Sequence, residues 1–83
     1  MFKVTLKEGL YPDSGTVLKE IGEAEMYELA NKLAIDYIND KKNLKDLGCV
    51  SLYVRKIFFS ETTPRCIGLD YGSYSRFVFI NEI

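Results

Sequence analysis

Hydrophobic and polar residues alternate at the start of the chain, which is the pattern of a half-buried β-strand. Phe2, Val4 and Leu6 alternate with polar neighbours. Because successive side chains of a strand point to opposite faces, this spacing predicts one buried and one wet face. A loop over 8–15 follows, and its last four residues, Pro-Asp-Ser-Gly, favour a turn. A short second strand over 16–21 would complete a hairpin.

The middle of the chain changes to helical spacing. The apolar positions recur at intervals of three and four residues; they are Met26, Leu29, Ala30, Leu33, Tyr37 and Ile38. Acidic residues crowd the start of this stripe and lysines its end, and both suit a helix dipole. The expected N-cap carries no Ser, Thr, Asp or Asn. The residue at which the helix starts is therefore fixed only to within a few positions. We predict one amphipathic helix along this stripe, followed by a connection over 43–47 that Gly48 closes.

After Gly48 the period returns to two. The pattern predicts a strand that starts with Val50, Leu52 and Val54, and a bulge at 55–56 that explains why Ile57, Phe58 and Phe59 are all apolar. Two more strands follow, over 67–71 and 74–81, joined by a tight hairpin turn at 70–73.

These elements predict a single α+β domain over residues 1–83. Its order is strand, second strand, helix and three strands. The last three strands form an antiparallel meander. We expect two layers, an antiparallel sheet of four to five strands and one helix packed on one face.

Composition narrows the class of protein. Eighty-three residues with a formal net charge of −1 argue against a nucleic-acid binder driven by overall charge. Two cysteines, Cys49 and Cys66, are too few for a disulfide scaffold.

The start of the chain has no signal-peptide pattern and no apolar run approaches membrane-spanning length, so we expect a cytoplasmic protein. The bias toward Phe, Tyr, Ile, Asn and Lys is typical of AT-rich genes, as in low-GC bacteria, their phages or plasmids.

The sequence offers no catalytic constellation. It contains no His, which removes Cys–His and Ser–His pairs and, with only two Cys, a structural zinc site. The glycines do not follow the spacing of a phosphate loop. We therefore predict no enzymatic activity, no cofactor and no metal.

An excess of apolar residues in the last strand is the strongest indication of function. Phe77 and Phe79 lie on one face of this strand, and Val78 and Ile80 on the other. One helix covers only one face, so the second must be covered by sheet curvature, by the loop around Leu10, or by another molecule.

The resulting hypothesis is a non-catalytic interaction protein, either a homodimer or a subunit that docks on a protein partner. Its size and composition fit a protein encoded by a phage or plasmid. Its interface would have apolar anchors and an aromatic and basic rim. The anchors are Phe59, Val78 and Ile80, and the rim is Tyr74 and Arg76.

The alternative is a weak single-stranded nucleic-acid-binding module. Residues 49–83 carry four basic and three acidic residues. Aromatic and arginine side chains that share an open sheet face can stack on unpaired bases. The candidates are Tyr53, Arg55, Tyr74 and Arg76.

Overall fold

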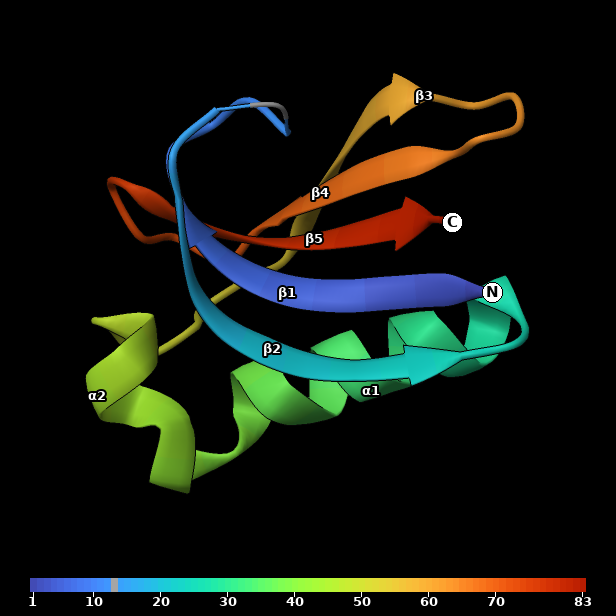
Figure 1. Ribbon diagram of the computed structural model, residues 1–83. Coiled ribbons are helices and arrows are strands. Elements are labelled where there is room, and N and C mark those ends of the chain that lie inside the picture. Colours follow the sequence, from blue (N-terminus) through green and yellow to red (C-terminus); the bar gives the residue numbers. More distant parts are fainter. Residues whose placement is uncertain (13) are drawn as a thin grey trace.

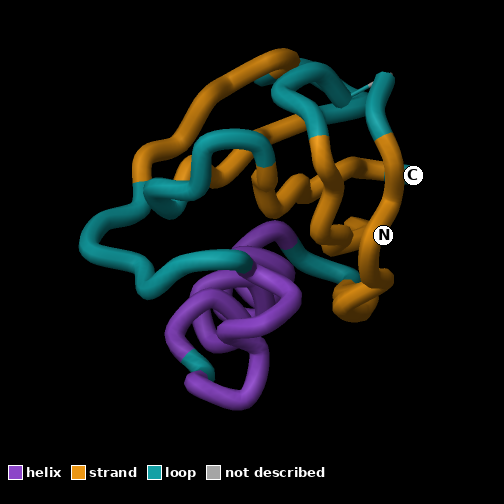
Figure 2. Tube along the Cα trace, turned by 90° about the vertical axis from the view of Figure 1, so that its left-hand side faces the viewer, coloured by secondary structure: helices purple, strands orange, loops and turns teal. Residues whose placement is uncertain are grey.

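The chain folds into a layer of helices packed on one antiparallel sheet, as a computed structural model that describes residues 1–12 and 14–83 shows (Figures 1 and 2). The predicted two-layer α+β class is confirmed. The elements of the described residues are β1 (Phe2–Glu8), β2 (Thr16–Ala24), α1 (Tyr27–Asn39), the 3-10 helix η1 (Lys41–Asn43), α2 (Leu44–Leu47), β3 (Arg55–Ser60), β4 (Cys66–Asp70) and β5 (Arg76–Glu82).

The five strands lie in the order β2-β1-β5-β4-β3, and every neighbouring pair is antiparallel. The first and last strands, β1 and β5, are therefore neighbours near the middle of the sheet. The N–H of Ile83 donates to the carbonyl of Met1 at 2.9 Å, which places the two ends of the chain side by side. β2 runs to Ala24, three residues beyond the predicted end of the second strand.

The main core lies between the sheet and α1. The sheet contributes alternate residues of its three central strands, Phe2, Val4, Leu6, Ile67, Leu69, Val78 and Ile80. The helix contributes Ala30, Ala34, Tyr37 and Ile38, and the small side chains of the two alanines let it approach the sheet closely. The predicted stripe is therefore rotated: Leu29 and Leu33 are partly exposed beside β2 rather than buried.

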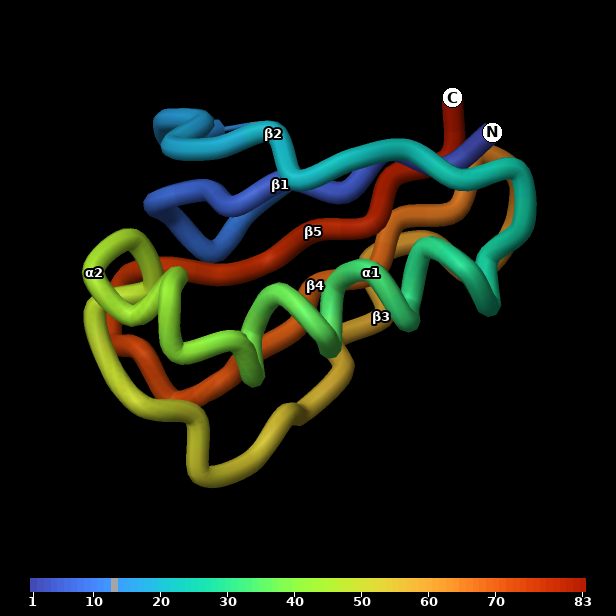
Figure 3. The backbone as a smooth tube through the Cα atoms, turned by 90° about the horizontal axis from the view of Figure 1, so that it is seen from below, coloured from blue at the N-terminus to red at the C-terminus, as the bar shows by residue number. Residues whose placement is uncertain are grey.

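Two local predictions in the second half of the chain are wrong. Residues 50–54 are irregular, and the side chain of Leu52 is 90% exposed; this segment bows away from α1 before β3 begins (Figure 3). The bulge lies at Phe59, where the pairing of β3 with β4 shifts register, and not at 55–56. Residues 50–54 alternate in polarity but have no neighbouring strand to pair with among the described residues, and alternation alone does not make a strand.

The turn after β4 is wider than predicted. Residues 71–75 connect β4 to β5, and Gly72 has a positive φ of 101°. Tyr71 continues the predicted alternation and is fully buried. The other predicted turn, at 12–15, includes Asp13, which lies outside the described residues; its last residue, Gly15, has a φ of 83°.

The opposite face of the sheet is covered by the chain itself. The rings of Phe59 on β3 and Phe79 on β5 lie 5.9 Å apart, across the intervening strand β4. Gly68 on β4 makes this contact possible, because a Cβ there would lie 2.9 Å from the Phe59 ring. Lys7 lies over the Phe79 ring and donates a 2.6 Å hydrogen bond to the carbonyl of Pro12. The sheet thus curls over its second face, and the loop after β1 folds back toward it.

Candidate functional site

The helix leaves part of its own side of the sheet open. α1 packs mainly on β2, β1 and β5, so the outer strand β3 extends beyond it. There Phe58 is 55% exposed although it lies in a strand next to the core. Between this strand and the start of α1 is a groove of about 290 Å³. We call it the α1–β3 groove; it is lined by Tyr27, Lys56, Phe58, Glu61, Arg65 and Ile67.

Two cations converge on the aromatic wall of the α1–β3 groove. The ammonium of Lys56 lies 5.6 Å from the centre of the Tyr27 ring, and the guanidinium of Arg65 lies 5.2 Å from it. Cations at such distances are attracted by the ring quadrupole. Glu82 lies 3.9 Å from Arg65, whereas Lys56 has no acidic partner within ion-pair distance among the described residues. The groove therefore combines apolar and aromatic surface with an unneutralised positive charge.

Two of the predicted interface anchors, Val78 and Ile80, lie on the sheet face that the helix covers, so their predicted exposure is wrong. Val78 is 0% exposed and Ile80 is 1% exposed, and both belong to the core beneath α1. The alternation of β5 was predicted correctly, but which of its faces meets the helix depends on the register of the whole sheet. Val78 and Ile80 are therefore not available as surface anchors in this fold.

The third predicted anchor, Phe59, does not lie at the groove, and the neighbouring Phe58 does. Phe59 packs on Phe79 across Gly68 and so fills the curled face. Phe58 pairs with Ile67 and points to the helix side. The missed signal is the shared face of paired residues: once Ile67 is assigned to the core side, its cross-strand neighbour must lie on that side as well.

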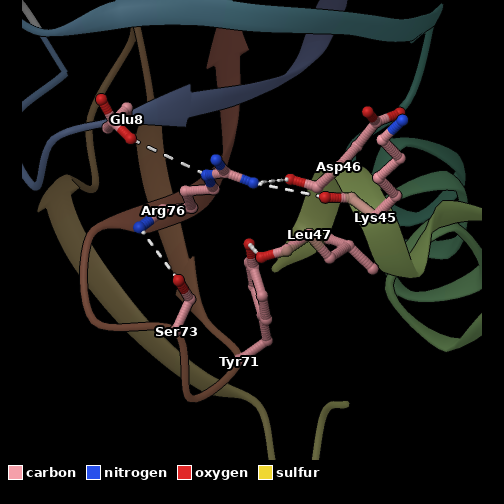
Figure 4. A network of polar contacts seen from close by, with 7 residues as sticks. All are labelled: Glu8, Lys45, Asp46, Leu47, Tyr71, Ser73 and Arg76. Carbon is pink, nitrogen blue, oxygen red and sulfur yellow. Dashed lines mark hydrogen bonds and ion pairs between the residues drawn. The ribbon is translucent and has the colours of Figure 1, made fainter. Parts of the chain in front are cut away.

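Arg76 is held within the protein rather than at a free rim (Figure 4). Its guanidinium donates to the carbonyls of Asp46 at 2.6 Å and Lys45 at 3.4 Å, at the end of α2. It also lies 3.8 Å from the carboxylate of Glu8. A cation on the last carbonyls of a helix stabilises that end. We therefore assign Arg76 a structural role.

Beside it, Tyr71 joins β4 to α2. Its hydroxyl donates a 2.6 Å hydrogen bond to the carbonyl of Leu47 (Figure 4). Burial raises the pKa of Tyr71 to about 12, because the charged phenolate would lose its hydration. Tyr71 and Arg76 together fix the short helix α2 on one end of the sheet.

The four nucleic-acid candidates do not share one sheet face. Arg55 forms an ion pair with Asp70 at 3.2 Å, on the face away from the helices, whereas Arg76 points toward α2. Tyr74 is fully exposed in the loop between β4 and β5, and Tyr53 precedes β3 near Gly72. The predicted stacking surface is therefore split between two faces and a loop.

The remaining candidate chemistry is limited. Cys49 and Cys66 are both free thiols, and burial raises the pKa of Cys66. Within residues 1–12 and 14–83, no group of three or more His, Cys, Asp or Glu side chains is placed to hold a metal ion. In the same residues, none of the helices has the length and apolar character needed to cross a membrane.

Comparisons of the chain with protein families, curated proteins and solved structures gave no match.

Proposed function

We propose that this chain is a small non-catalytic interaction protein of the cytoplasm, which docks on a protein partner through the α1–β3 groove. The observation that carries the proposal is the position of Phe58, more than half exposed beside a groove on the open part of the helix side. Exposed apolar side chains that gather around a groove favour an interface.

The residues around the groove are of the types that dominate binding energy at protein interfaces. Tyr27 and Phe58 offer rigid aromatic surface, and Arg65 offers a planar donor beside it. Aromatic and arginine side chains are enriched among residues that cost most when truncated. The unneutralised ammonium of Lys56 complements an acidic group. We therefore expect a partner segment that presents both apolar and acidic side chains.

The test is affinity capture from host lysate, with and without nuclease, read by mass spectrometry. Phe58→Ala is compared with Tyr74→Ala, which removes a fully exposed aromatic ring away from the groove. We expect one protein partner that survives nuclease, is retained by Tyr74→Ala and is lost by Phe58→Ala.

Three results would contradict the proposal. If both variants keep the same partner, the groove is not the docking site. If all partners disappear with nuclease, the single-stranded nucleic-acid hypothesis is preferred. If the wild type forms a dimer that Phe58→Ala abolishes, the groove is filled by a second copy.

A further inference from the structure

We infer that the partner supplies an extended acidic segment that adds to the sheet as a sixth strand, along the outer edge of β3. This inference rests on the proposed function and specifies the class of partner. The added strand would bond to the backbone of Lys56 and Phe58 and place an acidic side chain near Lys56 and Arg65. Strand addition to an exposed sheet edge is a general mode of peptide recognition.

The outer edge of β3 is unpaired. β3 has β4 as its neighbour and stands last in the strand order. Within the described residues, no backbone hydrogen bond reaches β3 from a turn or loop. Its outward N–H and C=O groups are therefore free to pair with another chain.

The hydrogen bonds at the chain ends identify which residues point outward. Glu82 donates to the carbonyl of Arg65, so by alternation Ile67 and Leu69 bond to β5. The alternate residues of β4, Gly68 and Asp70, then bond to β3, where their partners are Ile57 and Arg55. The backbone groups of Lys56 and Phe58 must point away from β4. The bond from Ile83 to Met1 gives the same phase, because it assigns the odd-numbered residues of β5 to β1.

The free backbone groups and the groove belong to the same residues. Lys56 and Phe58 carry the outward N–H groups, and their side chains line the α1–β3 groove. A strand added to β3 would continue the pleat, so that every second side chain faces the helix side next to Phe58. Backbone bonds would supply affinity, and the groove would select the side chains.

Charge selects an acidic partner over a second copy. Arg55 and Lys56 are both basic, and β3 carries no acidic residue. Pairing β3 with β3 of another copy would bring two unneutralised Lys56 ammonium groups to one edge, and like charges on adjacent strands are destabilising. Glu61 at the rim offsets part of the field, but Lys56 and Arg65 leave the groove lining with a formal charge of +1.

The other edge of the sheet is less suited to strand addition. β2 contains two irregularities, because Ile21 and Leu18 have no partner in the register with β1. Bulges bend a strand and interrupt the regular row of backbone groups. β3 is regular from Arg55 to Phe58.

The test uses a synthetic seven-residue peptide with valine and glutamate at alternate positions, and a control peptide with lysine in place of glutamate. Each is titrated into isotope-labelled protein and followed by NMR. We expect the glutamate peptide to bind about tenfold more tightly, because attraction to the cations of Lys56 and Arg65 is exchanged for repulsion. At saturation, amide exchange should slow at Lys56 and Phe58. The amides of Arg55 and Ile57, already bonded to β4, serve as internal controls.

Two variants separate backbone pairing from charge. Lys56→Pro removes an outward N–H, which an edge strand tolerates, and should abolish binding, whereas Lys56→Ala should retain it in weakened form. Lys56→Glu should reduce the preference for the glutamate peptide over the lysine peptide, and it keeps the test decisive if the proline variant does not fold. Failure of the glutamate peptide to protect the Lys56 and Phe58 amides would overturn the inference.

The inference and the proposed function fail in different ways. A lysate partner that depends on Phe58, together with no protection of the β3 amides by the peptide, would leave the docking site in place and remove only strand addition. Equal affinity for the two peptides would remove the acidic specificity. Loss of the Phe58 dependence itself would remove the proposed function.

Discussion

Tyr71 shows how one hydroxyl connects two parts of the fold. Its ring is fully buried, and its hydroxyl donates to the carbonyl of Leu47 at the end of α2. A buried carbonyl left without a donor costs about 1–3 kcal/mol. The bond therefore contributes to the stability of α2, and the burial of the same hydroxyl makes the stability of the fold depend on pH.

Replacing Tyr71 with Phe should lower the free energy of unfolding at pH 7 by about 1–2 kcal/mol, because the ring remains and the hydrogen bond is lost. In the wild type, the raised pKa of Tyr71 adds stability that is fully present below pH 10 and is lost as the pH rises from 10 to about 12. At pH 11, midway between the two pKa values, this loss is on the order of 1 kcal/mol. Urea unfolding at pH 7 and pH 11 measures both effects. Equal pH dependence in wild type and variant would contradict the role assigned to Tyr71.

Val78 and Phe58 provide a matched pair on one side of the sheet, one buried and one exposed. Val78→Asp places a charge in the core and should destabilise the fold by more than about 4 kcal/mol. Phe58→Asp should cost about 1 kcal/mol, the scale of strand preferences. Circular dichroism and urea unfolding distinguish the two. A folded, stable Val78→Asp protein would place Val78 at a surface after all.

The sequence predicted the alternation of these residues but not the direction of the faces. The pattern Phe77-Val78-Phe79-Ile80 is apolar on both sides, so it contains no signal for which side meets the helix. That choice follows from polar residues elsewhere: Lys3 and Lys7 on β1 require the side of Val4 and Leu6 to be the core side. Sheet pairing then places Val78 and Ile80 there.

At the scale of elements, Gly68 allows β3 and β5 to meet across β4. An added methyl group would lie 2.9 Å from the ring of Phe59 and 3.3 Å from that of Phe79. Since both rings are packed together, they can move only by giving up contact with each other. The curl of the sheet thus depends on the absence of a side chain at this position.

Gly68→Ala should therefore lower the free energy of unfolding by about 1–3 kcal/mol, as overpacking does elsewhere. The same substitution in a Phe59→Ala background should cost less, because the obstructing ring is gone. A double-mutant cycle from urea unfolding measures this coupling. Additive effects of the two substitutions would show that the Phe59–Phe79 contact does not set the curl.

The helix was also predicted better in extent than in orientation. Its spacing placed it correctly, yet Leu29 and Leu33 lie beside β2 and the small residues Ala30 and Ala34 face the sheet. The apolar stripe is wider than the surface that actually contacts the sheet. The rotation of the helix about its axis is therefore decided by how closely the side chains let it pack, and the spacing of apolar residues does not encode that distance. The α1–β3 groove is the result of that placement, and so it was missed.

At the scale of the whole molecule, the curled sheet covers its own second face. Of the three predicted ways to cover that face, the structure shows sheet curvature and the loop after β1, through Phe59, Phe79 and Lys7. We expect sedimentation equilibrium to give the mass of one 9.5 kDa chain over the micromolar range, because the edge strand β3 is basic and the edge strand β2 is irregular. A dimer that persists at 0.5 M salt would contradict both this expectation and the charge argument for β3.

The position of β5 has a consequence for synthesis. β5 is translated after the other four strands, yet it lies between β1 and β4. Of the sheet pairings among the described residues, β1–β2 and β3–β4 do not involve β5, so these two pairs can form before β5 leaves the ribosome, each with an apolar face in water. The sheet is thus completed by insertion of β5 between β1 and β4, which requires the edges of those two strands to stay unpaired, with each other and with other chains, until β5 reaches them.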